Sequence, residues 1–220
     1  NKHFLGFDSL ARSLITAVKE SVDNSLDACE EARMLPTLRI QINKIDANKD
    51  IIEMKTTDNG PGIPQQSVEK VFGQLLFGAR FHATLQSRGQ QGIGITGVVM
   101  YSQLTTGRPT HVRSKIATEA TASVVDIGLD TRKNKATKSN AAREIWEDEN
   151  GELVEHGLEV TCRMKAKYQK GRQSVWQYLR MTSIVNPHAD ITFIDPEGEV
   201  HHWPRVTERL PRVVESIKPH

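Results

Sequence analysis

Three polar residues of one predicted helix lie on a single face, where they could act together on a ligand. Glu20, Asn24 and Asp27 recur at intervals of four and three residues, so they share one helical face. That face lies opposite an apolar stripe, and small residues beside it leave room for a ligand. A carboxylate can act as a general base toward water, and an amide oxygen one turn away can bind a hard cation such as Mg²⁺. A solvated polar face is the alternative interpretation.

A short glycine-rich turn supplies a second type of chemistry. The sequence DNGPGI, residues 58–63, places Asp58 at the end of a predicted strand and Gly62 in the turn that follows. A carboxylate accepts a hydrogen bond from an exocyclic amine, and a glycine lets the backbone approach a flat base closely. The turn can therefore bind adenine, although an ordinary tight turn would have the same composition.

A longer glycine-rich stretch, QSRGQQGIGI, occupies residues 86–95 directly before an apolar helix. Successive glycines expose backbone N–H groups, and the start of a helix carries a partial positive charge, so phosphate fits there. Arg80 and Arg88 either add charge to that site or only solvate the loop. The stretch is not a P-loop, because no Gly-Lys-Ser/Thr follows it. The long irregular loop from Gly78 to Gly94, which contains most of this stretch, is also typical of a mobile lid.

The elements that must position these residues alternate between helices and paired strands. A long helix is predicted from a cap at Asp8 or Ser9 toward Pro36. Alternating apolar residues predict a hairpin over residues 37–58, and the charged stretch 130–140 is predicted to be a solvated loop. Further helices are expected at residues 65–77, 94–104 and 172–185, and further strands within 111–129, after a turn at 149–151, and within 189–203. The sum is an α/β sandwich with helices on one face of a mixed, mostly antiparallel sheet.

Composition restricts the class of protein. The 220 residues are 37% hydrophobic and 25% charged, as in a globular domain, and the net charge of +2 gives no general basic field. Cys29 and Cys162 lie far apart, which argues against a zinc site or a disulfide framework and indicates a reducing cytoplasm. No apolar run approaches the roughly 20 residues of a membrane span. The first residue is Asn1, so we expect a fragment of a longer protein.

Four stretches, taken in order, resemble the successive motifs of the GHKL ATPase superfamily, which includes gyrase, Hsp90, histidine kinases and MutL. They are ESVDNSLDA, DNGPGI, GQLLFGARF and SRGQQGIGI. Within that superfamily, VVMYSQL and VNPHADITFIDPEGEVHHWPRVTERLP are similar to the B subunits of type IIB enzymes, the topoisomerase VI family. The resemblance extends from about Phe7 to His220. It implies a two-layer Bergerat (GHKL) ATP-binding sandwich over residues 1–203. Residues 204–220 would be a linker toward helix-two-turns-helix and transducer domains.

The resemblance assigns roles to individual residues. It implies that Glu20 is the general base, that Asn24 is the Mg²⁺ ligand, and that Asp58 binds adenine with Gly62 beside the base. Ala79 and Arg80 would contact the nucleotide before the lid. The lid residues around the triphosphate would be Arg88, Gly89, Gln90, Gln91, Gly92, Ile93, Gly94, Ile95 and Thr96. Two positions depart from the family pattern. Thr96 stands where many relatives have lysine, and Leu158 stands where they have threonine, which puts a hydroxyl contact to Asp58 in doubt.

The resemblance also implies cofactors and partners. ATP with Mg²⁺ would drive dimerisation of two B subunits, gating double-stranded DNA for relaxation and decatenation, while the A subunit of topoisomerase VI carries the cleavage tyrosine. The expected location is the cytoplasm, at the nucleoid, with no membrane partner. Without the transducer lysine, we expect weak ATPase activity. The alternatives are a MutL-like GHKL ATPase, a catalytically weak nucleotide-binding module and a histidine-kinase domain. Glu20 argues against the last two.

Overall fold

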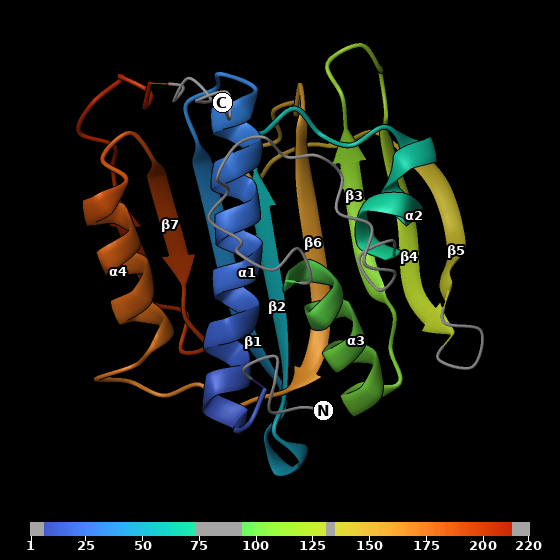
Figure 1. Ribbon diagram of the computed structural model, residues 1–220, viewed down its shortest axis with the longest axis vertical. Helices are drawn as coiled ribbons and strands as arrows, with labels where there is room; N and C mark the ends of the chain where they lie inside the picture. The colour runs from blue at the N-terminus through green and yellow to red at the C-terminus, as the bar shows by residue number, and fades with distance from the viewer. Residues whose placement is uncertain (1–6, 74–93, 131–134, 213–220) are drawn as a thin grey trace, which may run out of the picture.

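The computed structural model describes residues 7–73, 94–130 and 135–212. Its strands form one eight-stranded sheet in the order β5-β4-β3-β6-β2-β1-β7-β8, with the helices covering one face (Figure 1). The strands are β1 (Thr37–Asp46), β2 (Ile51–Asp58), β3 (Thr110–Lys115), β4 (Ala122–Asp130), β5 (Lys135–Glu144), β6 (Gly157–Lys165), β7 (Asp190–Ile194) and β8 (Val200–Trp203). The helices are α1 (Leu10–Glu31), α2 (Gln65–Gly73), α3 (Gly94–Thr106) and α4 (Val175–Val185), with a 3-10 turn η2 (Ala47–Lys49).

The sheet is mixed and mostly antiparallel, as predicted. Strand β1 pairs antiparallel with β2 on one side and parallel with β7 on the other. The other neighbouring pairs of this sheet are antiparallel. The predicted two-layer α/β architecture is therefore confirmed.

Helix α1 lies across the middle of the sheet (Figure 1). The side chain of Ser9 caps it by accepting a hydrogen bond from the backbone N–H of Arg12 at 3.3 Å. Its buried positions follow the helical period and pack into the core, which stabilises the helix more than propensity does. Beyond its end, Arg33 adopts a φ of 58° and Pro36 precedes β1, so the helix cannot continue.

The β1–β2 hairpin brings Asp58 to the helix-covered face of the sheet. Along β2, buried and half-buried residues alternate, and the buried set ends at Asp58. Asp58 pairs in register with Leu38 near the start of β1. A strand period of two thus places a carboxylate directly under the helical layer.

The prediction of a loop over residues 130–140 was wrong. Strand β4 runs to Asp130 and β5 begins at Lys135, the two residues pairing in register. β5 is an edge strand, and its residues from Thr137 to Arg143 are exposed. Because main-chain hydrogen bonds to β4 hold this strand, its exposed side chains need not be apolar. Its sequence therefore lacks the alternation of apolar and polar residues that would indicate a strand. The predicted turn at 149–151 is present, since the N–H of Gly151 donates to the carbonyl of Asp148 at 3.1 Å.

The helix predicted over 65–77 is described as far as Gly73, and its remainder lies outside the described residues. The segment from Pro204 to Arg212 contains no helix or strand. It lies against the domain, because the N–H of Val206 donates to the Pro187 carbonyl at 2.8 Å and Arg33 donates to the Pro211 carbonyl at 2.7 Å. Among the described helices, we find none with the length and apolar character that a bilayer requires.

Candidate functional site

A cavity of about 400 Å³ opens between α1, the end of β2 and the α2–α3 side of the helical layer. Its walls are mainly apolar, and its polar groups are few and come from α1 and β2. Such a cavity has the size and character of a site for a small organic ligand. It is lined by Ser21, Asn24, Ser25, Ala28, Glu31, Thr56, Asp58, Pro61, Gly62, Ile63, Val71, Phe72, Ile95, Leu158 and Val160.

Asp58 is the buried carboxylate of this cavity, with 6% of its surface exposed. The Ser25 hydroxyl donates to its Oδ2 atom at 2.5 Å, and the Gly60 N–H donates to its Oδ1 atom at 2.9 Å. Burial raises the pKa of Asp58, while these two donors act in the opposite direction, together with the backbone N–H of Leu158 and the charge of His156. The carboxylate is therefore held in one orientation, and because its two oxygens offer about four lone pairs, it keeps acceptor capacity for a further donor.

The turn after Asp58 is fixed from both sides. The Asn59 side chain accepts from the Thr37 N–H at 2.7 Å and donates to the Leu35 carbonyl at 3.0 Å. On the other side, the His156 Nδ1 atom lies 2.9 Å from the Gly60 carbonyl, which accepts its proton. These contacts tie the turn to the α1–β1 connection, to the start of β1 and to the loop before β6, and so preorganise the edge of the cavity.

Gly62 lies where a side chain would not fit. Its φ is +71°, and a Cβ atom there would overlap the backbone carbonyl of Lys115. The neighbouring Ile63 donates its N–H to the Ser114 hydroxyl at 2.6 Å, and that hydroxyl donates to the Ile63 carbonyl at 2.9 Å. The close approach of two backbone segments therefore requires glycine at this position.

Glu20 lies on α1 against the first residue of α3. A Cβ atom added to Gly94 would overlap the Glu20 Oε2 atom, so the carboxylate sits directly against the backbone that opens α3. The side chain is 23% exposed. Burial raises the pKa of Glu20; Lys19 lowers it and Asp23 raises it. A carboxylate whose pKa is raised by burial is suited to accept a proton.

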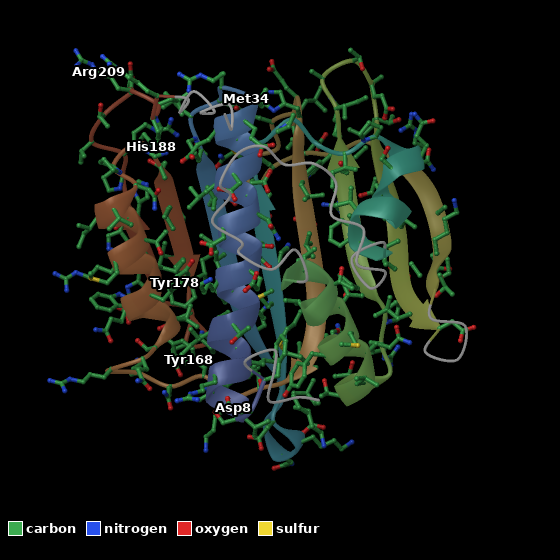
Figure 2. All side chains as sticks on the ribbon, viewed as in Figure 1. Asp8, Met34, Tyr168, Tyr178, His188 and Arg209 are labelled. Atoms are coloured by element: carbon green, nitrogen blue, oxygen red, sulfur yellow. The ribbon has the colours of Figure 1, made fainter. Side chains whose placement is uncertain are left out.

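A hydrogen-bonded chain connects α4 to the helix that carries Glu20. The Tyr178 hydroxyl donates to Asp23 Oδ1 at 3.2 Å; Figure 2 labels Tyr178 between α4 and α1. The Lys19 ammonium lies 3.1 Å from Asp23 Oδ2 and 4.0 Å from Glu20 Oε1. Asp23 therefore holds Lys19 nearer to itself than to Glu20, which limits how far the cation lowers the pKa of Glu20.

The structure brings several predicted site residues together. Asn24, Asp58, Gly62 and Ile95 line the same cavity, and Glu20 lies one helical turn from Asn24. Gly94 opens α3 beside Glu20. The predicted roles of Ala79, Arg80, Arg88, Gly89, Gln90, Gln91, Gly92 and Ile93 fall outside the described residues.

Thr96 faces the protein interior. Its side chain is completely buried, and its hydroxyl donates to the Phe72 carbonyl at 3.3 Å. Its N–H belongs to the first turn of α3, where backbone donors have no partner within the helix. The Thr96 hydroxyl is therefore engaged inside the protein, and only a contact from the Thr96 backbone N–H to phosphate stays a prediction.

Sequence reasoning missed Ser25. Leu158 contributes an apolar side chain to the cavity wall, and the hydroxyl that contacts Asp58 comes from Ser25 on α1. The available signal was a serine on the buried side of an amphipathic helix, one position after Asn24. That signal does not identify its partner, which lies 33 residues away along the chain.

Comparisons with known proteins agree with this geometry. The model of the "Histidine kinase-, DNA gyrase B-, and HSP90-like ATPase" family matches residues 9–137, more than half of the chain. Over 221 residues the chain is 48% identical to the B subunit of type 2 DNA topoisomerase 6 from Archaeoglobus fulgidus. Over 222 residues it is 46% identical to the protein of that name from Methanosarcina acetivorans. These alignments cover 100% of the chain but 35% and 34% of the relatives, so the chain spans about a third of their length.

Solved structures show the same fold. The Aquifex aeolicus MutL ATPase domain complexed with ADP has a TM-score of 0.53 at 21% identity, covering 88% of this chain and 64% of that one. The ATPase and transducer domains of DNA topoisomerase II from Balamuthia mandrillaris give 0.54 at 14% identity, covering 87% and 48%. At these identities the likeness concerns the fold alone. Because the family model covers more than half of it, the chain belongs to the histidine kinase-, DNA gyrase B- and HSP90-like ATPase family, a family of nucleotide-binding domains.

Proposed function

We propose that the chain is the ATP-binding and ATP-hydrolysing domain of the B subunit of a type IIB DNA topoisomerase. One observation supports this most strongly: a buried carboxylate, Asp58, lies in an apolar-walled cavity beside the helix that presents Glu20 at the start of α3. The identity of 46–48% to two proteins named as B subunits of type 2 DNA topoisomerase 6 supports the assignment to that enzyme class.

The cavity fits the adenine ring of ATP. Asp58 is oriented by neutral donors and keeps acceptor capacity for the 6-amino group. Apolar side chains such as Ile63 and Leu158 suit the flat faces of a base. Gly62 keeps the backbone close to that base, because no Cβ atom intervenes. The triphosphate would extend along α1 toward Asn24 and the start of α3.

Hydrolysis would use Glu20 as the group that accepts a proton from water. Its raised pKa makes it a stronger base than an exposed glutamate. Asn24, one turn along α1 and on the cavity wall, would hold Mg²⁺ through its amide oxygen. Bound Mg²⁺ would neutralise phosphate charge. The first turn of α3, whose N–H groups have no partner within the helix, begins beside Glu20, and these groups would donate to phosphate oxygens.

The larger activity would belong to the complete protein. Two B subunits would dimerise on binding ATP and gate double-stranded DNA, hydrolysis would reset them, and the A subunit of topoisomerase VI, as partner, would cleave the DNA. The location would be cytoplasmic, at the nucleoid. These proposals follow from the relatives' names and from the motif resemblance, and the relatives are about three times as long as the chain.

A calorimetric titration of the full-length protein with a non-hydrolysable ATP analogue, with and without Mg²⁺, tests the nucleotide site. A size measurement on the same samples tests dimerisation. Glu20→Ala should abolish hydrolysis and leave analogue binding largely intact, whereas equal loss of both would contradict the role of Glu20. ATP-dependent relaxation and decatenation after mixing with the A subunit would distinguish this function from a MutL-like ATPase.

A further inference from the structure

Burial raises the pKa of Asp58, and hydrogen-bond donors oppose that effect. Two titratable groups near it are His156, from the loop before β6, whose charge lowers the pKa of Asp58, and Cys29, from α1; Glu31 of α1 lines the same cavity. Burial, and then the charge of Asp58, raises the pKa of Cys29 to about 12, so the thiol stays neutral. The described residues of α2 and α3 that line the cavity, Val71, Phe72 and Ile95, are apolar. The ionised state of Asp58 therefore depends strongly on hydrogen-bond donors.

Ser25 supplies a donor of unusual geometry. A helical serine commonly donates to a carbonyl of the preceding turn of its own helix. The Ser25 hydroxyl instead crosses to β2 and lies 2.5 Å from Asp58 Oδ2, with 8% of the residue exposed. A hydroxyl has a single proton, and here that proton is committed to the carboxylate. Such a short contact is typical of a charge-assisted hydrogen bond to an ionised oxygen.

We propose that Ser25 is a positioning residue that makes the cavity selective for 6-amino purine nucleotides over 6-oxo purine nucleotides. It does so by holding Asp58 in one orientation as a pure hydrogen-bond acceptor. This inference rests on the proposed function, because it assumes that a purine nucleotide occupies the cavity.

The selectivity follows from donor and acceptor chemistry. An ionised carboxylate has lone pairs only, so it accepts from the 6-amino group of adenine. In the same pose, hypoxanthine presents a 6-oxo oxygen, and two acceptors repel each other. A protonated Asp58 could donate to that oxygen, so protonation would erase the preference. Without the Ser25 donor, the charged form of the buried Asp58 carboxylate is less stable, so Asp58 takes up a proton at higher pH. The preference for the 6-amino purine is then lost at higher pH than in the unchanged protein.

Ser102 offers a matched control far from this chemistry. It is also a buried helical serine that donates to a strand, since its hydroxyl lies 2.7 Å from the Arg163 carbonyl on β6. Ser102→Ala removes a comparable helix-to-strand hydrogen bond and leaves the cavity unchanged. Any general loosening of the fold by a missing serine hydroxyl would appear in this variant as well.

The experiment compares the full-length protein with Ser25→Ala, Ser25→Thr and Ser102→Ala variants. Calorimetry between about pH 5.5 and pH 8 measures the affinities of non-hydrolysable ATP and ITP analogues. Ser25→Ala should reduce the ATP-over-ITP preference about 10- to 100-fold, the effect of one hydrogen bond to a charged group. As the pH is lowered, the ATP-over-ITP preference that remains in Ser25→Ala should disappear at a higher pH than it does in the unchanged protein. Ser25→Thr keeps the hydroxyl and should restore the preference, and Ser102→Ala should match the unchanged protein.

A second measurement needs no nucleotide. The carbon-13 resonance of the Asp58 carboxyl, followed against pH in the ligand-free protein, should titrate at higher pH in Ser25→Ala than in Ser102→Ala. Identical preference and identical Asp58 titration in these two variants would overturn the inference. If the unchanged protein binds neither analogue, the proposed function fails and the purine selectivity fails with it. If it binds both analogues equally, the proposed site stands and only the selectivity is overturned.

Discussion

Replacing Gly94 with alanine should separate hydrolysis from binding, because one added atom falls on the proposed base. A Cβ atom at this position would overlap Glu20 Oε2, lie 2.7 Å from Cδ and lie 3.2 Å from Cγ. The obstructed atoms belong to the far end of a flexible side chain, so the carboxylate can rotate away without a backbone change. Alanine also favours helices over glycine, by up to about 1 kcal/mol. We therefore expect no loss of thermal stability in Gly94→Ala.

The size of the catalytic effect follows from the required movement. Ordinary contact for such a pair lies at 3.4–4 Å, so the Glu20 Cδ atom at 2.7 Å must retreat by roughly 1 Å. A displacement of that size in a reacting group costs about 100-fold in rate. That rate loss corresponds to about 2.7 kcal/mol of barrier. Affinity for a non-hydrolysable ATP analogue should change little, since Asp58 and the apolar walls are unaffected.

The assay is steady-state ATP hydrolysis by the full-length protein, with calorimetry and thermal unfolding as controls. Combining Gly94→Ala with Glu20→Ala closes a double-mutant cycle. If the alanine at position 94 acts through Glu20, it should add nothing to the residual rate of Glu20→Ala. A further decrease in the double variant, or an unchanged rate in Gly94→Ala alone, would refute the proposed contact between α3 and the base.

Three further changes test the remaining parts of the site. Asp58→Asn should weaken the ATP analogue about 10- to 100-fold in calorimetry, by removing a charged acceptor, without lowering the unfolding temperature, because burial disfavours the charged form. An unchanged affinity would exclude Asp58 from base recognition. Asp23→Asn removes a negative charge that, after burial, helps to raise the pKa of Glu20, so the acidic limb of the pH–rate profile should move to lower pH. A limb that stays in place would show that Asp23 does not tune the base. Gly62→Ala should destabilise the fold by about 1–3 kcal/mol in urea unfolding, since its Cβ would meet the rigid Lys115 carbonyl at a φ of +71°, and a wild-type midpoint would contradict this geometry.

The elements that sequence reasoning identified correctly are those whose packing leaves a periodic trace. Helix α1 and the β1–β2 hairpin bury one face each, so helical and alternating periods are visible along the chain. The pairing of Glu20 with Asn24 follows from the same helical geometry. The position of Asp58 under that helix follows from strand alternation and from the motif resemblance.

Other features have no local trace. The edge strand β5 exposes polar side chains almost throughout and is held by main-chain bonds to β4, so its composition is that of a loop. The partners of Ser25 and Tyr178 are set by tertiary packing, since the bonded residues are 33 and 155 positions apart along the chain. No spacing rule along one chain can indicate such contacts. Ser25 orients Asp58, and Tyr178 binds Asp23, which acts on the pKa of Glu20. The two residues do not themselves form a recognisable sequence motif.

The arrangement of α1 explains how one rigid element can serve both ends of a nucleotide. Ser25 holds the carboxylate proposed to bind the base, and the proposed general base Glu20 lies five residues earlier, so the two residues are separated by about 7.5 Å along the helix axis. Bonds from Ser25 to Asp58 on β2 and from Tyr178 on α4 to Asp23 attach this helix to two different elements. A shift of α1 along its axis would break both bonds at once, one of them buried. Its register is therefore fixed, and so is the distance between Ser25, which orients the proposed base-binding carboxylate, and Glu20, the proposed general base.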